Sequence, residues 1–320
     1  MHLLITGAQG FVGRALVARL LAHTPPWAGA PALTRLTLMD LAFPEPAADD
    51  RVRQLPGSIT DPALVAQAFE APVDAVFHLA SIPGGLAERE VELGRQVNLD
   101  ATVHLLEAAR RQQAAGPAPV FVFAGTIAAL GAPLPAAGVD DDTPCTPKLS
   151  YGAHKLIGEI LVADYTRRGW IDGRSVRLSG IVARPAGPSG LLSAFMSDII
   201  RELSEGRPFD CPISAESTVW LMSVPCLVDN LLHAAAMDGS ALGDGRVCTL
   251  PALHLTMAQL AEAVGQAYGV DTTGRVQWHD NPALEANFGR YPPLRTPRAE
   301  AAGFRHDGDA RTLALRALQG

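Results

Sequence analysis

The sequence predicts an α/β fold in which a doubly wound parallel sheet carries helices on both faces and a smaller C-terminal portion follows. Short apolar runs alternate with longer amphipathic ones through the first half of the chain. Strand-like runs such as residues 75–80 are nearly continuously apolar, which is typical of parallel strands buried on both faces. A glycine-rich turn joins the first expected strand to the first expected helix, and strand–helix repetition of this kind produces a parallel sheet.

The expected elements follow from this periodicity. Strands are expected at residues 2–6, 33–40, 52–55, 74–81, 119–126 and 175–181, and helices at 11–22, 62–71, 88–113 and 151–168. Beyond residue 180 the pattern becomes irregular, with helices expected at 190–204, 228–237 and 256–268 and a strand at 218–224. Residues 25–31 are rich in proline, glycine and alanine, so we expect an exposed loop there.

Composition and charge favour a small-molecule partner. The formal charge is −7, from 26 basic and 33 acidic residues, and no cluster of Lys or Arg interrupts it, which argues against nucleic acid or an anionic membrane as a partner. Apolar runs stop short of the roughly 20 residues of a membrane helix, and Met1 leads directly into a strand, so we expect a cytoplasmic protein. The four scattered cysteines indicate neither a disulfide framework nor a zinc site, and no metal is expected.

The first turn has the features of a dinucleotide site. Residues 6–13 read TGAQGFVG between strand and helix. Gly7 permits a sharp turn, Gly10 lets N–H groups approach a pyrophosphate, and Gly13 allows close helix packing, while the helix N-terminus favours an anion. The residues expected to contact the cofactor here are Gly7, Gln9, Gly10, Phe11, Val12 and Gly13.

An acidic residue indicates which dinucleotide binds. Asp40 closes the second expected strand, where a carboxylate can accept hydrogen bonds from the adenosine ribose and would repel a 2′-phosphate, so NAD is favoured over NADP. Ser58, Ile59 and Asp61 follow the third strand and are further candidates for contact with the adenosine. Asp61 precedes Pro62, however, and a helix N-cap explains it equally well.

A phenol and an ammonium group lie one helical turn apart. Tyr151 and Lys155 are at i and i+4, so they share one face of a helix. A nearby cation favours the phenolate and moves a phenol toward use as a base at neutral pH. Thr126 ends the fifth expected strand, where its hydroxyl can hydrogen-bond a substrate oxygen.

Together these motifs resemble the extended short-chain dehydrogenase/reductase family, also called the NAD-dependent epimerase/dehydratase family, over about residues 1–250. The resemblance implies a Rossmann-type domain, with Tyr151 as general acid/base, Lys155 binding the nicotinamide ribose and Thr126 orienting the substrate. Gly125-Thr126 stands where Ser-Ser is more usual, which leaves Thr126 as the sole hydroxyl of the pair. We expect an NAD-binding domain at 1–180 and a substrate-binding portion at 181–320, of which about 222–250 packs back on the first domain.

Two further segments match family motifs. His78-Leu79-Ala80-Ser81 resembles a stretch beside the cofactor, so Leu79, Ala80 and Ser81 are expected to contact NAD. Asn98 lies in a segment resembling VNxxGT and either contacts the cofactor or satisfies buried backbone groups. His78 and His154 are expected to be packing or surface residues.

The finer pattern resembles a sugar-acid dehydrogenase branch of this family. It implies NAD-dependent oxidation of the C2 hydroxyl of a four-carbon sugar acid, such as D-erythronate, to the 2-oxo acid. Dehydration is disfavoured because Ile127-Ala128 follows Thr126 in place of an acidic pair. The alternatives are a nucleotide-sugar 4-epimerase with tightly bound NAD and a dinucleotide-sensing regulator. The expected substrate-contacting residues are Ser81, Thr126, Ile127, Tyr151, Ser179 and Trp220.

The resemblance also implies a homodimer. Helices 88–113 and 151–168 have apolar positions around much of their circumference, and in relatives this pair forms a four-helix interface. Packing against the sheet alone is the other explanation.

Overall fold

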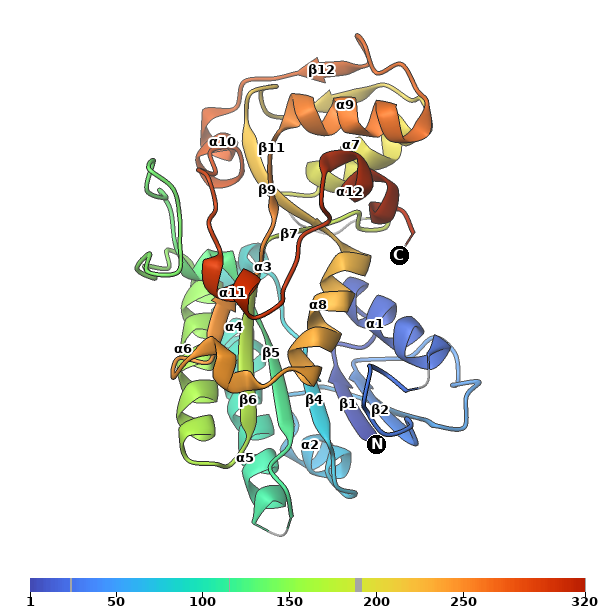
Figure 1. The fold of residues 1–320 in the computed structure, drawn as a ribbon, viewed down its shortest axis with the longest axis vertical. Helices are drawn as coiled ribbons and strands as arrows, with labels where there is room; N and C mark the ends of the chain where they lie inside the picture. Colours follow the sequence, from blue (N-terminus) through green and yellow to red (C-terminus); the bar gives the residue numbers. More distant parts are fainter. Residues whose placement is uncertain (24, 115, 188–191, 320) are drawn as a thin grey trace. The chain divides into compact units, whose positions relative to one another are not determined.

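The computed structural model describes residues 1–23, 25–114, 116–187 and 192–319 (Figure 1). These residues form two compact units, and each is described by itself. Unit 1 comprises Met1–Ala129, Pro147–Arg177 and Asn230–Cys248, and unit 2 comprises Leu130–Thr146, Leu178–Asp229 and Thr249–Gly320.

A seven-stranded sheet forms the centre of unit 1, which confirms the expected fold class. The strand order is β3-β2-β1-β4-β5-β6-β10, and the pairs β3–β2, β2–β1, β1–β4 and β4–β5 are parallel. This order, with the chain returning beside β1 after β3, creates the crevice at which doubly wound sheets bind ligands. The strands are β1 His2–Thr6, β2 Arg35–Asp40, β3 Val52–Pro56, β4 Ala75–His78, β5 Val120–Thr126, β6 Asp172–Leu178 and β10 Val247–Thr249.

Alternate side chains of the sheet face different helices. Leu4, Val76, Phe121 and Phe123 are buried with residues of α2 (Pro62–Ala68), α5 (Ala101–Gln113) and α6 (Ser150–Arg167). Helix α1 (Phe11–Ala22) covers the other face, where its residues line a cavity of about 220 Å³ together with side chains of β2 and β3. Side chains two residues apart on a strand point to the same face. Thr6 is two residues after Leu4 and His78 is two residues after Val76, so both point toward the α5 and α6 layer.

The single helix expected at 88–113 is wrong. The segment forms α3 (Gly84–Arg89), α4 (Val91–Arg95), the π-helical turn η1 (Gln96–Asp100) and α5. Glu90 breaks the first pair with φ −111° and ψ 68°. The π turn coincides with Asn98, whose side chain bonds the backbone of Ile82, and π turns of this kind often occur at functional sites.

Unit 2 has its own sheets and core. Strand β9 (Thr218–Ser223) lies between β11 (Leu253–Thr256) and β7 (Gly180–Val182), and β8 (Phe209–Cys211) pairs with β12 (Val276–Trp278). Helices α7 (Phe195–Ser204), α9 (Met257–Tyr268) and α12 (Ala310–Ala317) enclose the core against β9. The remaining helices are α10 (Pro282–Phe288) and α11 (Pro297–Ala301), while α8 (Val224–Ala236) has residues in both units and the short η3 (Gly239–Leu242) lies in unit 1.

Several boundaries differ from the expected ones, including three between residues 175 and 228. The strand expected at 175–181 divides at Ser179 into β6 and β7, which belong to different sheets. Helix α7 begins at Phe195, and residues 190 and 191 of the expected helix lie outside the described residues. Helix α8 begins at Val224 and not at 228, because the Ser223 hydroxyl accepts the Cys226 N–H as a cap.

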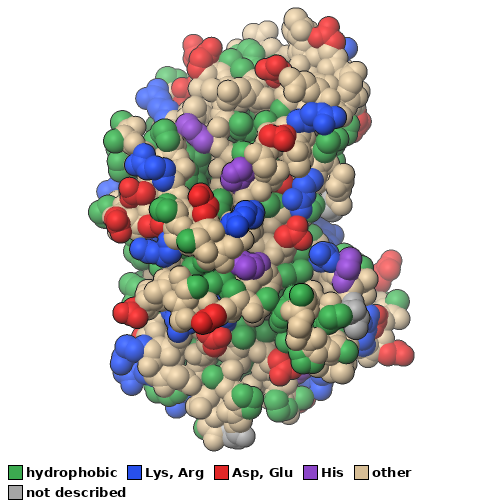
Figure 2. All heavy atoms as spheres, in the orientation of Figure 1, with side chains coloured by type: hydrophobic (Ala, Val, Ile, Leu, Met, Phe, Trp, Pro, Cys, Tyr) green, Lys and Arg blue, Asp and Glu red, His purple; other side chains and the backbone are tan. Residues whose placement is uncertain are grey.

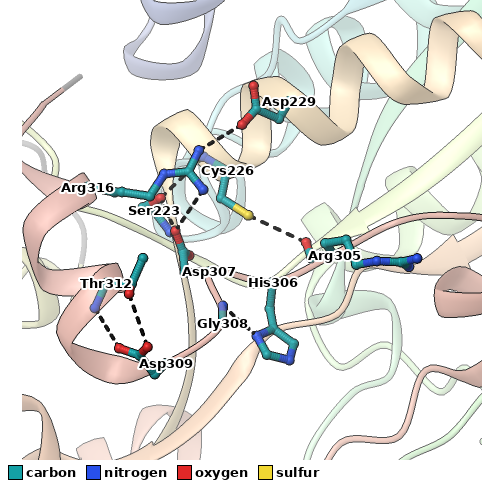
Figure 3. Close-up of polar contacts among 10 residues, drawn as sticks. All are labelled: Ser223, Cys226, Asp229, Arg305, His306, Asp307, Gly308, Asp309, Thr312 and Arg316. Atoms are coloured by element: carbon teal, nitrogen blue, oxygen red, sulfur yellow. Dashed lines mark hydrogen bonds and ion pairs between the residues drawn. The ribbon is translucent and has the colours of Figure 1, made fainter.

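A buried carboxylate anchors the C-terminal segment of unit 2 (Figure 3). Asp307 accepts the Ser223 N–H at 2.8 Å and the Ser223 hydroxyl at 2.5 Å, so it holds the residue that caps α8. Arg316 of α12 lies 3.7 Å from Asp307 and 2.7 Å from Asp229 of α8. The last residues of the chain are therefore tied to β9 and to the start of α8 by charged hydrogen bonds.

The surface carries charges of both signs. On the face drawn in Figure 2, acidic and basic side chains are interspersed. No helix within the described ranges has the length and hydrophobicity that crossing a bilayer requires. Within the described residues none of the four cysteines forms a disulfide, and three of them are buried.

One glycine of α6 fixes the distance between this helix and the sheet. A Cβ at Gly158 would lie 2.6 Å from Cζ of Phe123, so Gly158→Ala forces α6 away from β5. Overpacking of this kind outweighs the gain in helix propensity, and we expect the free energy of unfolding in urea to fall by about 1–2 kcal/mol.

Gly84→Ala is the matched control, because a Cβ there meets its nearest neighbours at 3.5 Å or more. Its effect should stay within about 0.5 kcal/mol. Equal stabilities of the two variants would contradict this account of how α6 packs.

Candidate active site

The glycine turn is clamped between two strands. Gly7 has φ +72°, and its N–H donates to the carbonyl of Met39 at the end of β2. A Cβ on Gly7 would lie 2.8 Å from the backbone nitrogen of Ala80, beyond β4. Only glycine therefore fits between the ends of β2 and β4.

The start of α1 is open to a phosphate group. Gly10 is the N-cap of α1 and supplies no side-chain hydrogen bond to it, and a Cβ on Gly13 would lie 2.1 Å from the carbonyl oxygen of Gly7. Backbone N–H groups at a helix start that carries no side chain are a suitable site for a pyrophosphate. The turn therefore fits NAD, as the sequence predicts.

Asp40 is close to this turn. Its Oδ2 accepts the Gln9 N–H at 2.8 Å, and its Oδ1 accepts the Leu41 N–H at 2.7 Å. The carboxylate thus holds the turn in place and still offers lone pairs to a ribose hydroxyl.

The residues after β3 show a capping arrangement. Asp61 Oδ1 accepts the Ala63 N–H at 2.8 Å at the start of α2, with Pro62 as the first helical residue. Ser58 bonds Thr60, and Ile59 is buried in the core. The capping role of Asp61 is therefore real, and an adenosine contact by these residues stays a prediction.

The end of β4 lies beside the glycine turn. The Leu79 N–H donates to the carbonyl of Thr6, and the Ala80 N–H donates to the Thr6 hydroxyl at 3.2 Å. The Ile82 N–H donates to Asn98 Oδ1 at 2.9 Å, and Asn98 Nδ2 donates to the Ile82 carbonyl at 3.1 Å. Asn98 therefore satisfies backbone groups, which is one of the two roles expected for it. Ser81, between the hydrogen-bonded residues Ala80 and Ile82, is exposed.

Tyr151 and Lys155 lie on the first two turns of α6. The Ser150 N–H donates to Glu88 of α3, and a Cβ added to Gly84 of α3 would lie 3.7 Å from the Cβ of Tyr151, so α3 packs against the start of α6. Lys155 is 2% exposed, and its Nζ lies 4.7 Å from the centre of the Phe123 ring. Burial lowers the pKa of Lys155 to about 8, against the opposing effect of Glu159.

A buried ion pair accompanies the lysine one turn further along α6. Arg177 of β6 donates to Glu159 from Nε at 3.0 Å and from Nη2 at 2.8 Å, a bidentate arrangement. Burial raises the pKa of Glu159, and the hydrogen bonds from Arg177 and the positive charges of Arg177 and Lys155 oppose that rise. Two cations thus surround one carboxylate in a low-dielectric setting.

Gly125 explains how this carboxylate fits. A Cβ at Gly125 would lie 2.8 Å from Glu159 Oε1, so the serine that is more usual at this position would displace Glu159. Glycine in place of the more usual serine at position 125 therefore leaves room for the Glu159–Arg177 ion pair.

Thr126 is joined to the start of α6. Its Oγ1 accepts the Ala128 N–H at 3.1 Å, within the turn η2 (Ile127–Ala129). A Cβ on Gly152 would lie 2.4 Å from the Ala128 carbonyl oxygen, so η2 packs directly against the turn that carries Tyr151. Thr126, Ile127 and Tyr151 therefore belong to one local structure.

Two predicted substrate residues lie in unit 2. The Ser179 hydroxyl, at the end of β6, is buried without a hydrogen-bond partner among the described residues. Trp220 is fully buried, its Nε1–H donates to the Pro292 carbonyl at 2.7 Å, and its ring lies 4.9 Å from that of Tyr291. Their contact with substrate stays a prediction.

Sequence reasoning missed the Glu159–Arg177 pair and the hydroxyls of Thr6 and Thr102. Glu159 follows Lys155 by four residues, so helical spacing could have placed the two charges together. The His78 ring lies 2.8 Å from the Thr6 hydroxyl and 2.9 Å from the Thr102 hydroxyl. Nothing in the sequence shows that the strand of Thr6 and the helix of Thr102 meet at this histidine.

Comparison with known proteins agrees with this architecture. Residues 3–221 match the NAD dependent epimerase/dehydratase family. D-erythronate dehydrogenase of Cupriavidus necator is 41% identical over 96% of this chain and 94% of its own length. D-erythronate dehydrogenase of Haemophilus influenzae is 32% identical over 97% of this chain and 96% of its own.

Solved structures share the fold. The nucleoside-diphosphate-sugar epimerase from Agrobacterium tumefaciens has a TM-score of 0.89 at 32% identity, covering 98% of this chain and 92% of its own. The L-threonine dehydrogenase from Cupriavidus necator, in its holo form, has a TM-score of 0.84 at 20% identity, covering 100% and 99%. The chain belongs to the NAD-dependent epimerase/dehydratase family and is an NAD-dependent oxidoreductase.

Proposed function

We propose that the protein oxidises the C2 hydroxyl of a small sugar acid such as D-erythronate to the 2-oxo acid. The observation that carries this proposal is the match to two D-erythronate dehydrogenases along almost the whole chain. The pair Tyr151 and Lys155, on one face of α6, supplies the groups that this oxidation needs.

Tyr151 acts as the general base. Oxidation of the alcohol removes a proton from its oxygen and a hydride from its carbon, and bound NAD supplies the hydride acceptor. The Tyr151 phenolate takes the hydroxyl proton, and in the reverse direction the phenol returns it. Thr126, joined to the same local structure through η2, donates a hydrogen bond to the substrate oxygen.

Lys155 provides the charge that makes a phenolate available. Its ammonium lies in a dry environment with Glu159 and Arg177, where Coulomb interactions are much stronger than in water. The two cations and one carboxylate leave a net positive charge, which favours the anionic form of a nearby phenol. The ammonium also offers hydrogen bonds to the nicotinamide ribose.

The residues proposed to hold NAD all belong to unit 1. Backbone groups of Gly7, Gln9, Gly10, Phe11, Val12 and Gly13 receive the pyrophosphate, and Asp40 accepts from the adenosine ribose. Ser58, Ile59 and Asp61 border the adenosine, and Leu79, Ala80, Ser81 and Asn98 border the nicotinamide half.

The proposed substrate contacts are Ser81, Thr126, Ile127, Tyr151, Ser179 and Trp220. Ser179 supports this proposal best, because its buried hydroxyl has no partner in the described part of the chain. A buried hydroxyl without a partner is costly unless a ligand satisfies it.

One observation favours the alternative of a nucleotide-sugar 4-epimerase. The structure with a TM-score of 0.89 is that of a nucleoside-diphosphate-sugar epimerase. An epimerase would retain NAD and return the hydride to the opposite face of the same carbon.

We also propose a homodimer formed through α4 and α6. Apolar side chains remain exposed on these contacting helices, including Val91 at 60%, Ile157 at 41% and Ile160 at 61%. Apolar patches of this kind are typical of interfaces, and a second copy of the chain presents the complementary apolar face.

The substrate and the base are tested together with purified enzyme, NAD and a panel of four-carbon sugar acids. The wild type should form NADH in proportion to sugar acid consumed, whereas Tyr151→Phe should lose roughly 10²–10⁴-fold in kcat and still bind NADH. Interconversion of UDP-sugars without release of NADH would establish the epimerase instead.

The role of Glu159 is tested by the pH dependence of kcat/KM for NAD. Lys155 loses its charge as the pH rises through its pKa of about 8, so kcat/KM should decline on the alkaline side. The Glu159 carboxylate raises the Lys155 pKa, so Glu159→Gln should move this decline to lower pH.

Glu92→Gln makes the same change at an exposed residue of α4 and should leave the profile in place. If the alkaline decline of kcat/KM in Glu159→Gln occurs at the same pH as in the wild type, or at higher pH, Glu159 does not raise the pKa of Lys155.

The dimer is tested by light scattering on eluted protein at micromolar concentration. The wild type should have twice the mass of the chain, and Ile160→Glu should be monomeric because it buries a charge in the interface. Leu318→Glu, at an exposed apolar residue of unit 2, is the control and should remain dimeric. A monomeric wild type would refute this proposal.

A further inference from the structure

A buried histidine connects two hydroxyl groups at the carboxyl edge of the sheet. His78, the last residue of β4, is 0% exposed. Its Nδ1 lies 2.8 Å from the Thr6 hydroxyl of β1, and its Nε2 lies 2.9 Å from the Thr102 hydroxyl of α5. The three side chains therefore form a chain of hydrogen bonds across the top of the sheet.

The remaining contacts give these hydrogen bonds a direction. The Thr102 hydroxyl donates to the Asn98 carbonyl at 3.2 Å, so it accepts the proton of His78 Nε2. The Thr6 hydroxyl accepts the Ala80 N–H, so its own hydrogen is available for His78 Nδ1. In the opposite tautomer the Thr6 hydrogen would have no acceptor among the described residues, so the Nε2–H form satisfies more groups.

His78 is suited to remain neutral in this position. Burial and the nearby positive charge of Lys155 both lower its pKa well below the ordinary value. Both side chains lie beside the Phe123 ring: Lys155 Nζ is 4.7 Å from its centre, and the centre of the His78 ring is 5.6 Å from it. A neutral imidazole that donates at one nitrogen and accepts at the other is what the two hydroxyls require.

The two ends of this chain of hydrogen bonds hold the loop that follows β4. Through Thr6 it reaches the N–H of Ala80, and through Thr102 it reaches the helix residue Asn98, whose side chain bonds both backbone groups of Ile82. The residues between these two points include Ser81, which is exposed. The hydrogen bonds of Thr6 and Asn98 thus hold the loop at Ala80 and at Ile82, on either side of Ser81.

We propose that His78 is a positioning residue for NAD, which acts by fixing Ala80 and Ile82 and thereby the loop on which the nicotinamide half of the cofactor rests. This inference rests on the proposed placement of NAD beside Leu79, Ala80 and Ser81, and it is independent of which sugar acid is oxidised. His78 touches neither reacting atom; it acts through Thr6, Thr102 and Asn98.

Two substitutions of His78 each keep one of its two hydrogen bonds and remove the other. The Asn amide oxygen in His78→Asn can replace Nδ1 toward Thr6 but does not reach Thr102, and the Gln amide nitrogen in His78→Gln can replace Nε2 toward Thr102. Thr6→Val and Thr102→Val remove one hydroxyl each and keep the β-branched shape. We expect each of the four changes to raise the Kd for NADH, measured by fluorescence titration, by about tenfold.

Phe77→Leu is the matched control. Phe77 is fully buried on the same strand but faces the opposite side of the sheet, so it should lower stability without changing the Kd for NADH. If the His78 and threonine variants bind NADH within twofold of the wild type while losing stability as Phe77→Leu does, His78 is only a packing residue and the proposal is overturned.

A measurement on the wild type covers the case in which His78 variants do not fold. Nitrogen NMR of the nine histidines should show one that stays in the neutral Nε2–H form from pH 5 to 8. A His78 in the Nδ1–H form, or one that becomes charged in this range, would overturn the proposal. Because neither readout uses a sugar acid, failure of the proposed substrate leaves this test intact.

Discussion

The burial of one ammonium group shapes the rest of the active site. The sequence contains only two lysines, Lys148 and Lys155, and every other basic side chain apart from histidine is an arginine. Lys155 lies against the Phe123 ring with 2% of its surface exposed, and a charge taken out of water needs compensation nearby. The Glu159 carboxylate supplies that compensation, and Arg177 in turn fixes Glu159 with two hydrogen bonds.

This constraint explains features that look unrelated in the sequence. Gly158 lets α6 approach β5 closely enough for Lys155 to reach Phe123, and Gly125 leaves room for Glu159. The same cation helps to keep His78 neutral, and the neutral imidazole can then connect Thr6 to Thr102. The charge on α6 and the loop after β4 are therefore parts of one electrostatic arrangement, built on the face of the sheet that α5 and α6 cover.

The sequence predicts strands β1 to β6 and helices α1 and α2 to within a few residues, because apolar runs and the glycine turn are local signals, but it does not predict β10. It does not predict the breaks in residues 84–113: Glu90 interrupts the helix there, and Asn98 of the π turn bonds Ile82, a contact that only the folded chain brings together. It places Tyr151 and Lys155 on one helix face by spacing alone. It indicates the capping of α2 by Asp61, but it cannot show that Arg177 of a distant strand meets Glu159.

The most direct test of this account is the titration of Lys155 itself. With lysine labelled in ¹³C and ¹⁵N, the protein gives signals from only two side chains, and Lys155→Arg identifies the one that belongs to the active site. The account predicts that the Lys155 signal titrates with a pKa of about 8, so that the group is still mostly charged at neutral pH. A pKa near 10.5, as in an exposed lysine, would show that the ammonium is not buried as described, and the account would then be wrong.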